Sequence, residues 1–309
     1  MNWNVYLPIA GNSVSIFLLL GLGGIVGFLS GLFGVGGGFL MTPLLIMAGI
    51  PPLVAAASDS NQIVAASTSA SYAHYRMGNV DLKMGLLLLV GGVVGGTFGV
   101  QLIKVLRSLG NADFVIKITY VVMLGVVGFY MFVESLQSLR TRPVEVKQVV
   151  STKPSLYVRV VRALPWQMEF PKSGVTTSPL LPLILGAFVG VLAAIMGVGG
   201  GFIMVPVMVY MLRMPMHVVV GTSLFQILFT CVNVTIMQAV TNYTVDIVLA
   251  VLLLLGSTVG AQFGARLSRR LKGDQLKIIL ASVVLLVMLQ MLFGLVVSPH
   301  VMLAYKGGH

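Results

Sequence analysis

The chain has 309 residues, of which 57% are hydrophobic and only 9% are charged, and its mean hydropathy is +1.01. Soluble domains carry roughly 25% charged residues, so this composition excludes ordinary soluble domains and argues against nucleic-acid binding and a soluble enzyme core. The 19 basic and 8 acidic residues give a net charge of +11, which in a membrane protein reflects basic residues collected in cytoplasmic loops. We therefore expect a polytopic membrane protein embedded in a lipid bilayer.

The charges are clustered, and the intervals between the clusters are long enough for membrane spans. No charged residue occurs in the intervals 1–58, 84–103, 173–212 and 278–305. A helix needs roughly 20 apolar residues to cross the hydrocarbon core of a bilayer. Each interval therefore has room for one or two helical spans, and the pattern predicts an all-α fold.

An internal repeat organises the chain. The segment Gly34-Val-Gly-Gly-Gly-Phe-Leu-Met-Thr-Pro43 recurs as Gly197-Val-Gly-Gly-Gly-Phe-Ile-Met-Val-Pro206, 163 residues later. The match continues at an offset of 164 or 165 through polar and glycine positions, and two copies of one structural unit are the simplest explanation. We expect a first membrane repeat in residues 1–135, a basic cytoplasmic linker in 136–178 and a second membrane repeat in 179–309.

Each copy contains five apolar segments. In chain order they cover about 14–34, 37–49, 52–75, 84–104 and 115–134, then 180–197, 200–212, 215–239, 247–265 and 278–297. The second segment of each copy has about 13 residues and reaches only about 20 Å, which is short of the ~30 Å core. It also contains a proline, Pro43 or Pro206. We expect a short or interrupted helix that follows a glycine-rich turn.

Two topologies fit these segments. If all five segments of each copy cross the membrane, the copies are inverted and 15 of the 19 basic residues face the cytoplasm. If the first two segments form one broken span, the protein has eight spans with re-entrant elements, and the basic residues divide 10 to 9. The positive-inside rule favours inverted repeats with both termini in the periplasm. The eight-span alternative stays open because short segments can be re-entrant.

The glycine-rich turns are the first candidate for a binding site. A turn that opens a short helix exposes backbone N–H groups at the positive end of the helix dipole, which suits an anion. Paired interrupted segments at corresponding positions point to a transporter binding site. Helix packing is the alternative, and we prefer it only for the glycines spaced by four residues, such as Gly91 and Gly256. The turn residues predicted to bind substrate are Gly36, Gly37, Gly38, Gly199, Gly200 and Gly201.

Neutral polar residues on the third segments are the second candidate. Ser58 and Gln62 lie on one helical face, and Thr222 and Gln226 occupy the matching face of the other copy. Hydroxyl and amide groups can donate to an anion, and they are equally suited to hydrogen bonds between helices. We prefer the two glutamines as side-chain ligands because they occupy equivalent positions.

Asp59 is the only acidic residue well inside an apolar segment. A charge at that depth is costly and suggests a function, so Asp59 is a candidate for a coupling proton. Its alternative is contact with water, since it lies only about two turns from the start of the segment at Pro52. Asp81 and Asp246 precede the fourth segments and are expected to cap those helices.

The sequence predicts neither a metal site nor an organic cofactor. Cys231 is the only cysteine, and no two of the four histidines have the spacing of metal ligands. An embedded enzyme would need a nucleophile with a base, or metal ligands, at membrane depth. We therefore expect a protein that is not an enzyme.

The repeat motifs resemble those of the TauE/SafE sulfite exporter family, also called the sulfonate uptake permease family. The segments that carry the resemblance are Gly31-Leu-Phe-Gly-Val-Gly-Gly-Gly-Phe-Leu-Met-Thr-Pro43, Asn61-Gln-Ile-Val-Ala-Ala-Ser67, Arg76-Met-Gly-Asn-Val-Asp81 and Met196-Gly-Val-Gly-Gly-Gly201. The resemblance implies a bacterial inner-membrane protein that moves anions such as sulfite, sulfoacetate or thiosulfate, usually outward, without an organic cofactor.

Together these observations predict a secondary transporter of a small oxyanion. Alternating access would occur at the interface of the two inverted repeats. A passive anion channel is the nearer alternative, and a membrane-embedded enzyme is the more distant one. The sequence carries no signal for the oligomeric state.

Overall fold

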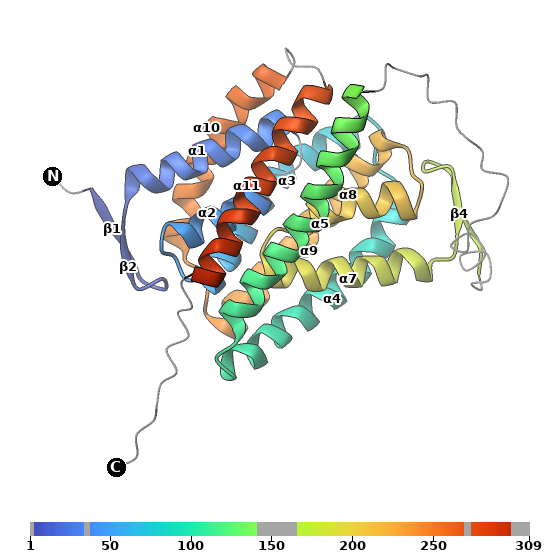
Figure 1. Cartoon of the computed structure of the whole chain (residues 1–309). Coiled ribbons are helices and arrows are strands. Elements are labelled where there is room, and N and C mark those ends of the chain that lie inside the picture. Colours follow the sequence, from blue (N-terminus) through green and yellow to red (C-terminus); the bar gives the residue numbers. More distant parts are fainter. Residues whose placement is uncertain (1–2, 34–37, 141–165, 269–272, 298–309) are drawn as a thin grey trace.

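A computed structural model describes residues 3–33, 38–140, 166–268 and 273–297 (Figure 1). The helices of the first copy are α1 (Ile16–Phe33), α2 (Gly38–Met47), α3 (Pro52–Arg76), α4 (Leu82–Ser108) and α5 (Ala112–Arg140). Those of the second copy are α7 (Leu180–Met196), α8 (Gly201–Pro206), α9 (Met216–Met237), α10 (Ile247–Ser268) and α11 (Gly273–Val297). Two π-helical turns, η1 (Val207–Met211) and η2 (Gln238–Asn242), continue α8 and α9. The expected helical fold is confirmed.

Five helices are long and apolar enough to span a membrane, namely those of α4, α5, α9 with η2, α10 and α11. The second segment of each copy is short, as the sequence predicted. α2 has 10 residues and is therefore about 15 Å long, and α8 has six residues before the π-helical turn. Pro43 lies inside α2, and Pro206 ends α8 where the π-helical turn begins. The chain is thus a multi-pass membrane protein with interrupted elements.

Two β-hairpins were not predicted. Strand β1 (Asn4–Leu7) pairs with β2 (Asn12–Ser15), and β3 (Met168–Phe170) pairs with β4 (Val175–Thr177), both antiparallel. Each hairpin precedes the first helix of a copy, and the second lies in the stretch expected as a linker. The sequence does carry a signal for this extension of the repeat, because the same offset of 163 relates three pairs: Trp3 and Trp166, Pro8 and Pro171, and Gly11 and Gly174.

The two copies exchange helices at their closest contacts. α1 packs along α10, and α4 packs along α7, so the first helix of each copy lies against the fourth helix of the other (Figure 1). Glycine makes this approach possible, since a Cβ on Gly27 would lie 2.2 Å from Ser257 O and one on Gly95 would lie 1.9 Å from Ala187 O. The packing role expected for the regularly spaced glycines is confirmed.

Equivalent helices of the two copies also contact one another. α3 packs against α9, and α5 packs against α11. In the second pair a Cβ on Gly125 would lie 3.9 Å from Met288, whereas one on Gly128 would lie 2.7 Å from Val284. Residue numbers at the contact thus rise along α5 while they fall along α11, so the two helices are antiparallel. Figure 1 shows them side by side with opposite chain directions.

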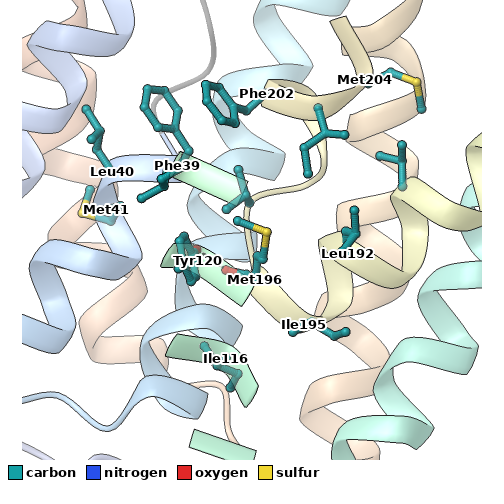
Figure 2. Close-up of a cluster of buried hydrophobic side chains, with 14 of the residues drawn as sticks. Phe39, Leu40, Met41, Ile116, Tyr120, Leu192, Ile195, Met196, Phe202 and Met204 are labelled. Atoms are coloured by element: carbon teal, nitrogen blue, oxygen red, sulfur yellow. Dashed lines mark hydrogen bonds between the residues drawn. The ribbon is translucent and has the colours of Figure 1, made fainter. Parts of the chain in front are cut away.

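The interior is mainly apolar with buried polar side chains, and the outer surface is apolar as well. A central cluster joins side chains of α2, α5, α7 and α8, including Phe39, Tyr120 and Phe202 (Figure 2). Large apolar side chains also lie on the outside, and Phe98 and Phe293 are more than 60% exposed. Such a surface suits contact with lipid acyl chains and would be unusual in a soluble monomer.

We predict that Gly27→Ala destabilises the protein by about 1–3 kcal/mol, because the new methyl group overlaps the Ser257 carbonyl of α10. Gly21→Ala is the matched control on the same helix, since a Cβ at Gly21 meets no atom within 4 Å. Thermal unfolding in detergent, followed by the loss of the monodisperse peak in size-exclusion chromatography, measures both. Equal midpoints for the two variants would contradict the proposed packing constraint.

Candidate functional site

Equivalent residues of the two copies meet at the centre of the protein. Phe39 and Phe202, which are 163 residues apart, stack with ring centroids 4.5 Å apart and an interplanar angle of 13°. Ile63 of α3 and Ile227 of α9, which are 164 residues apart, pack in one buried cluster. Contacts between equivalent residues, together with the opposite directions of α5 and α11, are typical of a two-fold relation between the copies. A local two-fold axis therefore passes between the starts of α2 and α8 and through the contact of α3 with α9.

Gly38, the first residue of α2, and the glycine turn before α8 converge at this axis. A Cβ on Gly38 would lie 2.3 Å from Ile63 Cδ1, and one on Gly199 would lie 3.2 Å from Ile63 Cγ2. The first turn of α2 and the turn before α8 thus contact the same isoleucine side chain. Gly36 and Gly37, which the sequence also predicted as ligands, lie outside the described residues.

The turn before α8 requires glycine for its backbone shape. Gly197, Gly199 and Gly200 have φ values of +72°, +68° and +76°, in the left-handed region that side chains other than glycine rarely adopt. The carbonyl of Gly197 accepts a hydrogen bond from Ser60 Oγ at 3.1 Å, which attaches this turn to α3 of the other copy. Close packing requires glycine here as well, since a Cβ on Gly197 would lie 2.0 Å from Ala56 O and one on Gly200 would lie 2.3 Å from Val189 Cγ1.

The start of α8 also presents backbone donors. The first helical hydrogen bonds of this segment run from Ile203 N and Met204 N to Gly200 O, at 3.1 and 2.7 Å. The N–H groups of Gly201 and Phe202 precede those bonds and belong to the set that a helix leaves without intrahelical partners. The predicted ligand residues Gly199, Gly200 and Gly201 therefore lie where an acceptor could complete the helix start.

Asp59 lies beside the first turn of α2 and is completely buried. Its Oδ2 accepts a hydrogen bond from Thr42 Oγ1 at 2.9 Å and is 3.5 Å from the position of a Cβ on Gly38, whereas its Oδ1 has no hydrogen-bond partner. The carboxyl group therefore does not reach water in this structure. The sequence does not point to its partner Thr42, because a single hydroxyl in a short apolar helix is not distinctive.

Tyr120 of α5 closes the same region from another side. Its hydroxyl donates a hydrogen bond to the carbonyl of Met196, the last residue of α7, and the two residues lie together in Figure 2. The ring is fully buried among the central apolar side chains. Tyr120 thus satisfies a helix-end carbonyl next to the glycine turn, a role that the sequence did not suggest.

The two glutamines are buried with unsatisfied amide groups. Gln62 is 6% exposed and Gln226 is fully buried, and Oε1 of each lacks a hydrogen-bond partner. Nε2 of Gln226 donates to Thr230 Oγ1 at 2.8 Å, in a space that Gly92 of α4 leaves open, since a Cβ there would lie 2.7 Å from Nε2. A half-turn of the amide exchanges its oxygen and nitrogen, so the free end can accept or donate. Buried polar atoms without partners are uncommon and call for an explanation.

The two predicted hydroxyl ligands form hydrogen bonds between the copies. Ser58 Oγ accepts from the backbone N–H of Asp246 at 3.2 Å, and Thr222 Oγ1 accepts from that of Asp81 at 3.0 Å. Both hydroxyls are fully buried. The structure thus gives Ser58 and Thr222 the helix-to-helix role, which the sequence could not distinguish from anion binding.

The predicted helix caps are confirmed. Asp81 and Asp246 accept hydrogen bonds from backbone N–H groups in the first turns of α4 and α10. Their second carboxylate oxygens accept from the hairpin turns, from Ser173 N to Asp81 and from Ile9 N to Asp246, both at 3.1 Å. Each hairpin therefore attaches its own copy to the other copy.

The described residues contain neither a candidate metal site nor an exposed reactive thiol. Within those ranges, no group of three His, Cys, Asp or Glu side chains is placed to hold a metal ion. Cys231 is a free thiol, buried in the cluster with Ile63 and Ile227. The unsatisfied polar atoms near the two-fold axis therefore define the candidate site.

Comparison with known proteins gives a consistent result. The family model described as "Sulfite exporter TauE/SafE" matches residues 19–291. The chain is 28% identical to "Probable membrane transporter protein YjnA" of Bacillus subtilis over 276 residues, which cover 88% of this chain and 97% of that protein. It is 23% identical to "Probable membrane transporter protein YunE" of the same organism, over 91% of this chain and 98% of that protein. "Sulfite exporter TauE/SafE family protein 2" of Arabidopsis thaliana is 31% identical over 32% of this chain and 22% of its own length. No solved structure matches the chain.

We predict that Thr222→Val destabilises the protein by about 1–3 kcal/mol, because it leaves the buried N–H of Asp81 without an acceptor. Thr222→Ser keeps the hydroxyl and serves as the control. Thermal unfolding in detergent compares the two variants. If valine and serine give the same midpoint, the hydroxyl does not join the copies as described.

Proposed function

The chain belongs to the TauE/SafE sulfite exporter family, and we propose that it is a secondary transporter of small sulfur-containing oxyanions. The full-length relatives carry names of membrane transporters, and the helices suit a lipid bilayer. Sulfite, sulfoacetate and thiosulfate are the substrates that we propose, with export across the bacterial inner membrane as the direction. The single observation that supports this proposal is the convergence of the starts of α2 and α8 at the contact of α3 with α9, the two helices that carry the unsatisfied glutamines Gln62 and Gln226.

The proposed substrate lies between the starts of α2 and α8. Helix starts attract anions because their free N–H groups and the helix dipole both favour negative charge. In the proposal, N–H groups of the two glycine runs, Gly36 to Gly38 and Gly199 to Gly201, bind the substrate oxygens. The amides of Gln62 and Gln226 complete the ligand set from the neighbouring third helices. Ser58 and Thr222 hold those helices in position through their bonds to the opposite copy.

Burial of the site supports a carrier over a passive channel. Asp59, Gln62 and Gln226 are each at most 6% exposed, and a bound anion there would be separated from both aqueous phases. A carrier requires such an occluded conformation, whereas a conducting pore requires a continuous path through the site.

An inverted arrangement of the repeats is the proposed basis of alternating access. The opposite directions of α5 and α11 support it, because a two-fold axis that reverses equivalent spans lies in the membrane plane. The interlocked pairs α1 with α10 and α4 with α7 further indicate that each moving body contains helices from both copies. In this proposal both chain termini are periplasmic and the segment between the repeats is cytoplasmic.

We predict that Gln62→Ala and Gln226→Ala each lower the initial rate of anion flux about tenfold, because each removes a hydrogen bond to a charged ligand. Uptake of labelled sulfite, thiosulfate and sulfoacetate into proteoliposomes measures the rate. Gln290→Ala, on the exposed face of α11, is the matched control and should retain the wild-type rate. Wild-type protein without anion-dependent flux would refute the function, and full flux in the double alanine variant would refute the site.

Topology has its own test, because the inverted arrangement places the ends of α4 and α10 on opposite faces of the membrane. Asn111→Cys should react with an impermeant maleimide from the periplasm, and Ser268→Cys only after the cytoplasmic face is opened. Buried Cys231 should give little background labelling. Labelling of both positions from the same side would support the parallel, eight-span arrangement instead.

A further inference from the structure

We propose, on the basis of the transport function above, that Asp59 makes anion binding conditional on the uptake of one proton. The anion and the proton would then cross the membrane together. The proton is taken from water on the open side onto Asp59 Oδ1 and is released to water on the other side with the anion.

The carboxyl group of Asp59 lies at the N-terminus of α2, where an anion would otherwise bind. Its Oδ2 lies 3.5 Å from the Cβ position of Gly38, the first residue of α2, and bonds to Thr42 one turn later. An ionised carboxylate here interacts with the positive end of α2 and repels a second anion at the same place. Ionised Asp59 and a bound oxyanion therefore compete.

Protonation removes the competition and adds a ligand. Oδ1 has no hydrogen-bond partner in the structure, so it is the oxygen free to take the proton. A protonated carboxyl group carries an O–H donor, whereas the ionised group only accepts. The same atom that repels an anion when ionised can thus donate to the anion when protonated.

The surroundings of Asp59 do not neutralise its charge in another way. The described polar groups that interact with Asp59 are Thr42 of α2, through a hydrogen bond, and Tyr120 of α5 and Cys231 of α9, through electrostatics, and none of them is a cation. Among the described residues no basic side chain pairs with Asp59. A buried charge without such a partner is costly, so the occluded site with a bound anion favours protonated Asp59, and the proton leaves when the site opens to water and the anion is released.

A proton fits this place better than a metal cation does. Hard cations bind through about six or more oxygen ligands. The described surroundings supply the carboxyl group of Asp59 and the hydroxyls of Thr42 and Tyr120, whose hydrogens are already donated to Asp59 and to the carbonyl of Met196. Sodium dependence is therefore the outcome that would exclude the proton in favour of another coupling ion.

Only one copy carries this arrangement, which sets the number of protons at one. The equivalents of Asp59 and Thr42 are Ser223 and Val205. Ser223 is buried, and its hydroxyl donates to the carbonyl of Val220 at 3.0 Å within its own helix. The turn before α8 is therefore free of a competing carboxylate.

The test uses purified protein in proteoliposomes with thiosulfate, an anion that holds no exchangeable proton near neutral pH. Labelled thiosulfate reports the anion, and an entrapped pH-sensitive dye reports the proton. In wild type, inward thiosulfate movement should acidify the lumen, with one proton per anion. By linkage the apparent affinity should fall about tenfold per pH unit wherever Asp59 loses its proton.

Two variants remove the carboxylate in different ways. Asp59→Ser installs the residue of the equivalent position, and Asp59→Asn keeps the shape of the side chain. The thiosulfate exchange that each variant supports in counterflow, at whatever rate, should proceed without lumen acidification and without the pH dependence of affinity. Asp113→Asn, at an exposed position in the first turn of α5, is the control and should stay coupled.

The outcomes separate this inference from the transport function. Absence of thiosulfate, sulfite and sulfoacetate flux in wild type refutes transport itself and the coupling with it. Wild-type flux without proton movement, flux that needs sodium, or full proton coupling in both Asp59 variants refutes the coupling and leaves transport intact.

The reverse substitution Ser223→Asp adds a second carboxylate beside α8 and should raise the ratio towards two protons per anion. An unchanged ratio with intact flux would contradict competition at the helix starts.

Discussion

The meeting of Phe39 with Phe202 and of Ile63 with Ile227 is the constraint on which the centre of the protein depends. A side chain beside a two-fold axis faces its own counterpart, so both residues must fit one shared volume. Flat stacking of two rings and contact of two branched aliphatic chains satisfy this condition without any polar atom. With the axis filled in this way, polar groups are displaced to either side, where the helix starts and the glutamines lie.

Several polar contacts of one copy are repeated in the other, so the contacts that are not repeated are easy to identify. Ser58 of the first copy accepts a hydrogen bond from Asp246 of the second, and Thr222 of the second copy accepts the equivalent bond from Asp81 of the first. Asp81 and Asp246 each cap a helix and bind a hairpin. The hydrogen-bonded pair of Thr42 and Asp59, in contrast, is not repeated in the second copy, where Val205 and Ser223 take their places. The features shared by both copies therefore hold the helices and hairpins together, whereas the pair of Thr42 and Asp59 adds an ionisable group to the first copy alone.

The sequence predicts the helices well because the charge-free intervals mark the apolar segments, and the repeat places matching segments in the other copy. It could not decide what Ser58 and Thr222 do, since a hydroxyl suits an anion and a neighbouring helix equally. The contact of Tyr120 with the end of α7 depends on tertiary packing, which leaves no local pattern. The hairpins were missed although Trp166, Pro171 and Gly174 repeat their N-terminal equivalents, because three matches among short polar strands are a weak signal. Whether the glycine turns and glutamines bind an anion stays a prediction.

The exchanged pairing of α1 with α10 has a consequence for how the protein is made. During synthesis α1 enters the bilayer first, yet the helix that covers its glycine face follows only after most of the chain has been inserted. Until then Gly23 and Gly27 present bare backbone to lipid or to the insertion machinery. Such long-range pairing slows assembly. Truncated chains that end before α10 should therefore insert without maturing and become substrates for membrane quality control.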